Sequence, residues 1–299
     1  MSPRASTLIQ RADTVQRAHP PLALPVAVYR KFGDERAGRL AAVIAYYGFF
    51  SLFPALLALV TVLGFVLEDR EDLRDDIQRS ALGQLPVIGD YIGEAATRPL
   101  TGNAAALVIG LLTALWAGMG AMQASQDAVN TVFEVPRSEQ PSFVKKRARS
   151  LLMLVVLGGL LVGGAALTQF VNALGDVAVL ARLLLFAGTL ALNAGVFWIA
   201  YQVLIAERQP WRALLPGAIT AGIGYHLLQV VGQLYVNHVL KGAQDTYGTF
   251  ATVIGLLSWL HLMAQITLLG AVVNVVTAKG LWPRHLTRTL ESPRKQRTR

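Results

Sequence analysis

Hydrophobic and polar positions are grouped in long blocks along this chain. Six blocks contain no Asp, Glu, Lys or Arg: residues 40–67, 99–126, 150–175, 183–206, 213–240 and 246–278. The hydrocarbon core of a membrane is about 30 Å thick, so a helix needs roughly 20 apolar residues to span it. A charged residue at the centre of such a helix costs about 2.5–3.5 kcal/mol. The pattern therefore predicts an all-α, polytopic membrane protein.

We expect six transmembrane helices within a domain that covers residues 26–280. The predicted spans are residues 40–67, 104–126, 150–172, 182–206, 213–238 and 248–277. Residues 1–25 are polar and residues 281–299 form a basic tail, so both are predicted to be disordered. Residues 26–39 mix apolar and basic side chains, as in an amphipathic helix on a membrane surface. Apolar residues between the first two spans recur at helical spacing and predict a short helical cap there.

The basic residues predict the orientation of these spans. If the spans alternate in direction, 21 of the 27 Lys and Arg residues lie on one side and 6 on the other. Cytoplasmic loops are enriched in Lys and Arg, so both termini are predicted to be cytoplasmic and the cap periplasmic. The net charge of +9 is then explained by orientation and by contact with anionic lipid headgroups. Nucleic-acid binding is not required.

Composition agrees with a membrane protein and narrows the chemistry. Only 15% of the residues are charged, whereas soluble domains carry about 25%. Cysteine is absent, which excludes disulfides, thiolate metal sites and a Cys nucleophile. No Gly-x-x-x-x-Gly-Lys-Ser/Thr loop is present, so ATP would not drive the protein directly.

Three of the predicted spans carry short motifs in a characteristic order. The motifs are Ala45-Tyr46-Tyr47-Gly48-Phe49-Phe50-Ser51-Leu52-Phe53-Pro54, Pro216-Gly217-Ala218, Tyr247-Gly248-Thr249-Phe250, Ser258-Trp259-Leu260 and Gly270-Ala271. In this order they resemble the YihY/BrkB family of bacterial inner-membrane proteins, over roughly residues 26–280. Family members commonly have an acid directly after the last Gly-Ala pair, where this chain has Val272. A carboxylate role there, such as proton coupling, is therefore absent or lies elsewhere.

The resemblance implies an inner-membrane protein whose relatives have been labelled both a ribonuclease and a virulence or serum-resistance factor. A metal-dependent nuclease needs clustered His, Asp or Glu ligands. The histidines are His19, His226, His238, His261 and His285, and they form no His-x-His or His-Glu pair. We therefore expect no ribonuclease activity, no metal and no other cofactor.

Polar residues form three stripes at helical spacing in the predicted spans. The stripes are Gln123, Asp127, Asn130 and Glu134 in the second span, His226, Gln229, Gln233 and Asn237 in the fifth, and Ser258, His261 and Gln265 in the sixth. Each stripe falls on one helix face. Such residues join helices by hydrogen bonds worth about 0.6 kcal/mol on average, line a path for a headgroup or solute, or contact another protein. The sequence leaves all three roles open.

Two further groups of residues are candidates for binding. Pro54 interrupts the first span and frees a backbone carbonyl. Tyr46, Tyr47 and Ser51 could donate hydrogen bonds to this carbonyl or to a ligand. Basic residues on the predicted cytoplasmic side suit anionic headgroups, because guanidinium groups donate paired hydrogen bonds to phosphate. These residues are Arg39, Arg147, Arg149, Arg208 and Arg212, which also fit a simpler role as orientation signals.

Three functions are compatible with these features. The leading hypothesis is an inner-membrane transporter or translocator of a lipid or anionic amphiphile, because the stripes are polar and no catalytic cluster is visible. The second is a non-catalytic scaffold that binds envelope proteins, or copies of itself as a homo-oligomer. The third is a membrane enzyme acting on lipids, for which only Asp127 and Glu134 are available.

Overall fold

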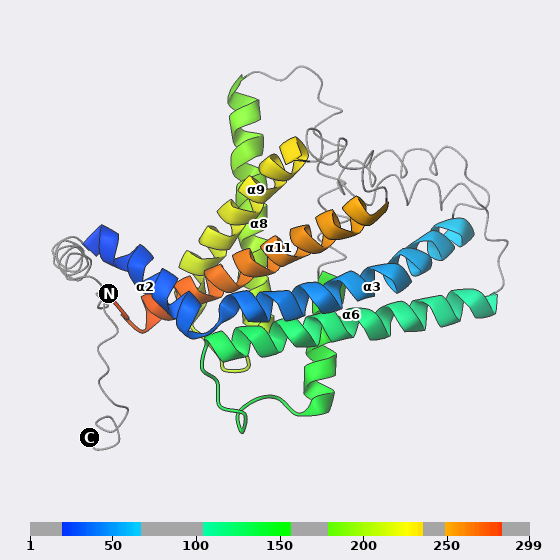
Figure 1. Ribbon diagram of the computed structural model, residues 1–299, viewed down its shortest axis with the longest axis horizontal. Coiled ribbons are helices and arrows are strands. Elements are labelled where there is room, and N and C mark those ends of the chain that lie inside the picture. Colours follow the sequence, from blue (N-terminus) through cyan, green and yellow to red (C-terminus); the bar gives the residue numbers. More distant parts are fainter. Residues whose placement is uncertain (1–19, 67–103, 157–178, 236–248, 283–299) are drawn as a thin grey trace.

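The structure is a computed structural model that describes residues 20–66, 104–156, 179–235 and 249–282. Its elements are α2 (Pro20–Asp34), α3 (Ala37–Val66), α6 (Ala104–Val132), α8 (Val179–Leu204), the 3-10 helix η1 (Trp211–Leu214), α9 (Leu215–Tyr235) and α11 (Thr249–Ala278) (Figure 1). Residues 143–156 are also helical. The described ranges contain no strand, and the all-α prediction is confirmed.

Five stretches of these helices are long and apolar enough to cross a membrane. They lie in α3, α6, α8, η1 with α9, and α11, and match the first, second, fourth, fifth and sixth predicted spans. Of the third predicted span, residues 150–156 are described and are helical. The rest of that span and the predicted cap lie outside the described residues, so the count of six remains a prediction.

The helix before the first span begins earlier than the sequence predicted. It starts at Pro20, so residues 20–25 are helical and do not belong to a disordered tail. Its side chains Ala23, Ala27, Val28 and Lys31 are buried, and the helix packs against α3 and α11. This helix, α2, is therefore part of the bundle.

The helices form two pairs with α11 between them (Figure 1). Along one side α3 packs against α6, and on the other α8 packs against α9, while α11 contacts both α3 and α9. The ends of α6 and α11 gather beside α2, and the two pairs diverge with distance from it. We call the end of the bundle that carries α2 the terminal end.

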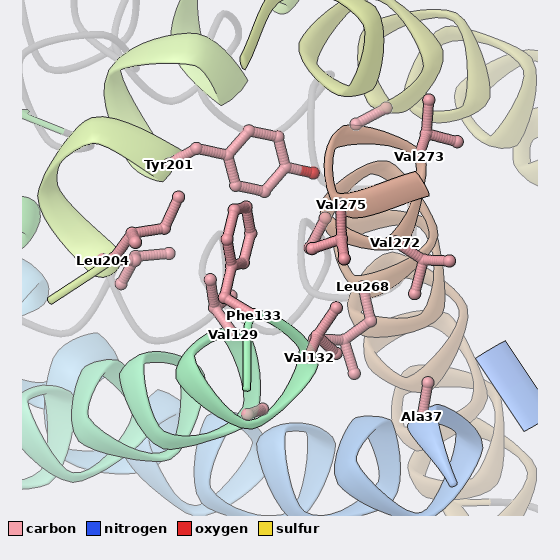
Figure 2. Packing of buried hydrophobic residues seen from close by; sticks show 14 of the residues in the cluster. Ala37, Val129, Val132, Phe133, Tyr201, Leu204, Leu268, Val272, Val273 and Val275 are labelled. Carbon is pink, nitrogen blue, oxygen red and sulfur yellow. The ribbon is translucent and has the colours of Figure 1, made fainter. Parts of the chain in front are cut away.

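Apolar side chains fill the terminal end (Figure 2). The residues come from α6 and the position after it, from α8 and from α11, and all are buried. We call this group the apolar plug; it comprises Val129, Val132, Phe133, Tyr201, Leu204, Leu268, Val272 and Val275. Because these side chains are buried against one another, the plug packs three helices together at the terminal end.

Small residues allow α9 and α11 to cross closely beside the plug. A Cβ atom added to Gly217 would overlap the carbonyl oxygen of Gly270 and the side chain of Asn274. The Gly217 amide donates to Asn274 Oδ1 at 2.7 Å, and the Tyr201 hydroxyl donates to the Thr267 carbonyl at 2.7 Å. Backbone approach and hydrogen bonds thus fix three helices together where lipid provides no hydrophobic drive.

The crossing predicts a large difference between two glycine substitutions. Gly217→Ala should lower stability by about 1–3 kcal/mol or more, because the added methyl group forces α9 away from α11. Gly195→Ala on α8 is the matched control, because its Cβ would meet nothing within 4 Å. Thermal melting in detergent should show a lower midpoint for Gly217→Ala than for the wild type. The midpoint of Gly195→Ala should not be lower than that of the wild type. Equal midpoints would contradict this account of the crossing.

Candidate functional site

The polar stripe of α6 joins helices at the terminal end. Asn130 Nδ2 donates to the Leu204 carbonyl at 3.1 Å, and Asn130 Oδ1 accepts from the Ala206 amide at 2.7 Å. One turn earlier, Gln126 Nε2 donates to Ser150 Oγ at 2.8 Å. These bonds tie α6 to the end of α8 and to the helix 143–156. The helix α6 continues to Val132, past the predicted membrane span that ends at residue 126, as the helical spacing of the stripe implied.

Two other members of this stripe are less enclosed. Asp127 is exposed and accepts a hydrogen bond from the Lys146 ammonium group. Gln123 is half-buried. The four predicted residues of this stripe therefore have different surroundings and do not form one site.

Glu134 belongs to an ion cluster that we call the terminal latch. The latch comprises Lys31, Glu35, Glu134 and Lys279. The Lys31 ammonium group donates to Glu35 Oε1 at 2.7 Å and to Glu134 Oε1, and Lys279 Nζ donates to Glu134 Oε2 at 3.0 Å. Lys31 is only 1% exposed, whereas Glu134 is 52% exposed. The latch connects α2 with the residues that follow α6 and α11.

The backbone of Glu134 is held in an unusual conformation within this latch. Its φ is 60°, in the left-handed region that costs most residues roughly 1–2 kcal/mol. Hydrogen bonds from the Glu134 amide to Thr131 O and from the Val135 amide to Asn130 O, both 3.0 Å, close the helix end. Glycine is usual at such a position. A glutamate is stabilised there because its carboxylate accepts hydrogen bonds from the ammonium groups of Lys31 and Lys279.

The latch changes the acidity of Glu134. The hydrogen bond from Lys31 lowers the pKa of the Glu134 carboxyl below its ordinary 4.5, partial burial opposes this change, and Lys279 lowers it further. Because the folded-state pKa lies below the unfolded one, the carboxylate stabilises the fold above about pH 4.5. That stabilisation is lost as the pH falls through the folded-state pKa.

Beyond the plug, the same helix faces carry polar side chains. On α11, His261 and Gln265 are half-buried and hydrogen-bonded to each other at 2.9 Å. At about 100° per residue they lie within roughly 80° of Leu268 and Val272. Asn193 is half-buried on the α8 face that carries Tyr201.

The stripe on α9 has a mixed environment. His226 is half-buried, and its ring meets that of Phe186 edge to face with centroids 4.9 Å apart. Gln229 is half-buried on the face that carries Tyr225, whose ring lies 6.2 Å from that of Phe197 on α8. The side chain of Gln233 and the whole of Asn237 lie outside the described part of the chain. Ser258, from the α11 stripe, is exposed.

Within the described part of the chain, Tyr46, Tyr47 and Ser51 make no hydrogen bond to the carbonyl freed by Pro54. Ser51 Oγ donates to the Gly48 carbonyl of its own helix at 2.7 Å. Tyr46 is 57% exposed and Tyr47 is 47% exposed, and the Tyr47 ring packs against α6 at Gly120. These residues face the outside of α3 or its contact with α6.

The candidate arginines occupy three kinds of surroundings. Arg39, Arg208 and Arg212 are exposed, and the Arg212 guanidinium lies 4.9 Å from the Trp211 ring centroid. Arg149 donates to the Ile205 carbonyl at 3.2 Å. Arg147 is half-buried and stacked on two aromatic rings.

Comparison with known proteins identifies the family. Residues 28–294 match the family described as Virulence factor BrkB. The chain belongs to this family. Within the described residues, no group of three His, Asp or Glu residues is placed to hold a metal ion.

Relatives extend over most of the chain. Inner membrane protein YhjD of Escherichia coli K12 is 24% identical over 90% of this chain and 84% of its own length. The ribonuclease-like protein YfkH of Bacillus subtilis 168 is 25% identical over 80% of this chain and 89% of its own length. UPF0761 membrane protein PA0951 of Pseudomonas aeruginosa PAO1 is 26% identical over 85% of this chain and 62% of its own length. No solved structure matches the chain. The protein is thus an integral membrane protein of the BrkB family.

Several residues of the bundle were not predicted as candidates from the sequence. Lys31 was read as one charge of a surface helix, and Asn274 was not considered, although both are buried. Asn193 and Tyr225 were also missed. Asn193 did carry a signal, because a single amide within an apolar span is itself a reason to expect an inward position.

The latch predicts a pH-dependent loss of stability. Glu134→Gln should destabilise the protein by about 1–3 kcal/mol at neutral pH, less than the roughly 3–5 kcal/mol of a fully buried pair, because Glu134 is half exposed and Glu35 still pairs Lys31. Its melting midpoint should also fall less than that of the wild type on acidification below pH 4.5. Asp127→Asn, which breaks a more exposed pair, should cost under about 1 kcal/mol. Equal effects of the two variants would contradict the latch.

Proposed function

We propose that the protein is a transporter that moves a lipid or another anionic amphiphile across the bacterial inner membrane without hydrolysing ATP. One observation supports this most. On α8 and α11 the residues of the plug are apolar and buried, and one to two turns further from the terminal end these helices carry the half-buried polar residues Asn193, His261 and Gln265. Polar residues within membrane helices tend to face a bundle interior or a water-filled path.

The chemistry of these faces suits a headgroup. Asn193, Gln229 and Gln265 each carry both a donor and an acceptor, and His261 adds a ring that can do either. A headgroup could exchange bonds with water for bonds with these amides, while its acyl chains remain in the surrounding lipid. None of these groups is permanently charged, so they would hold a substrate weakly enough to release it.

In this proposal the terminal end is the closed side. The plug and the latch block passage there, and a transport cycle would separate α2 and the ends of α6 and α11. The basic-residue distribution supports placing this end in the cytoplasm, and the printed name of YhjD supports the inner membrane.

A scaffold is the second candidate, because part of the polar content is already used in packing. Asn130 and Gln126 bond neighbouring helices, and Glu134 bonds two lysines. If Gln265 and His261 serve only each other, no substrate path is needed.

Vesicles containing the purified protein and fluorescent phosphatidylglycerol test the proposal. Wild-type protein should move the lipid between leaflets faster than empty vesicles. Gln265→Leu and His261→Leu should slow this about three- to tenfold, the effect of one lost hydrogen bond of about 0.5–1.5 kcal/mol. Gln202→Leu, on an exposed position of α8, should leave the rate unchanged. No movement by folded protein would favour the scaffold. Movement at equal rates in all variants would contradict a path that uses Gln265 and His261.

A further inference from the structure

Arg147 has surroundings that differ from those of its basic neighbours. Its guanidinium carbon lies 4.3 Å from the centroid of the Trp116 ring and 4.5 Å from that of the Phe143 ring. The two rings are 64% and 66% exposed. A cation is therefore fixed against two aromatic faces at the surface of the bundle.

The hydrogen-bonding capacity of this guanidinium is not used up. Its Nε is shielded from water and has no hydrogen-bond partner. By contrast, Lys146 bonds Asp127, and Arg149 bonds the Ile205 carbonyl. Leaving a shielded donor without an acceptor is unfavourable, so an arriving acceptor would be bound with little competition.

The position of the stack indicates the class of acceptor. Trp116 lies within the stretch Val108–Val132 that is long and apolar enough to cross a membrane. The exposed rings therefore offer apolar surface to acyl chains beside a cation. Guanidinium groups bind phosphate oxygens through paired N–H donors and stack on aromatic rings at the same time.

We propose that Arg147, Trp116 and Phe143 form a binding site for the phosphate of an anionic phospholipid. The phosphate bonds the guanidinium edge, and one acyl chain lies along the exposed rings. Access to Nε requires one ring to turn aside, and little packing opposes this because both rings are largely exposed. The site lies on the surface of the bundle and does not depend on the proposed transport.

Native mass spectrometry of the full-length protein, with phosphatidylglycerol and phosphatidylcholine as probes, tests this site. Wild-type protein should retain phosphatidylglycerol preferentially. Arg147→Gln should weaken its binding about tenfold, the effect of losing charge-assisted hydrogen bonds. Arg147→Lys keeps the charge but not the paired donors, so it should fall between the two.

Arg137→Gln is the matched control, because Arg137 is exposed just before the helix 143–156 and the change in net charge is identical. It should bind lipid as the wild type does. Equal weakening by Arg137→Gln and Arg147→Gln would overturn the site in favour of a general charge effect. Displacement of the lipid by millimolar inorganic phosphate would overturn the assignment to lipid in favour of a soluble anion. If Arg147→Gln does not fold, wild-type affinity in folded Arg147→Lys would overturn the proposal.

Discussion

The buried ammonium group of Lys31 constrains the whole terminal end. A charge with 1% exposure is tolerated only when it is paired, because desolvation of an unpaired ion costs several kcal/mol. Its partners are Glu35 on the turn after α2 and Glu134 after α6, and Glu134 in turn pairs Lys279 after α11. Three segments far apart in sequence must therefore meet at one point, and the apolar plug packs beneath them.

This constraint gives the bundle two different ends. At the terminal end, ion pairs, the Asn130 hydrogen bonds and the close Gly217–Gly270 approach join the helices directly. Away from it the helix pairs diverge (Figure 1). There the buried apolar residues of α8 and α11 give way to the half-buried polar residues Asn193, His261 and Gln265. A scaffold has no need of such a change, whereas a transporter needs one closed end and polar contacts beyond it. The family membership supports an integral membrane protein.

The sequence predicted the positions of the membrane helices, which depend on hydropathy. It did not predict the contacts between residues that are far apart in the chain. The charge-free blocks located α3, α6, α8, α9 and α11, because the cost of a charge in lipid acts at each position separately. The helical spacing of the stripe implied that α6 continues past residue 126, but it could not identify the partners of Gln126 and Asn130 on other helices. Lys31 was misread as a surface charge because its partner Glu134 is 103 positions away. The stripes were predicted from helical spacing alone. Spacing does not show whether a polar residue bonds another helix, as Asn130 does, or a residue of its own helix, as Gln265 does.

Cysteine labelling in cells tests the central claim most directly, because the chain contains no cysteine of its own. Gln265→Cys and Leu268→Cys place single thiols one turn apart on the same face of α11, on either side of the change from polar to apolar. A membrane-impermeant maleimide added from the periplasm should label position 265 and not position 268. Equal labelling of the two thiols, or labelling of position 265 only from the cytoplasmic side, would contradict a polar path that is closed at the terminal end.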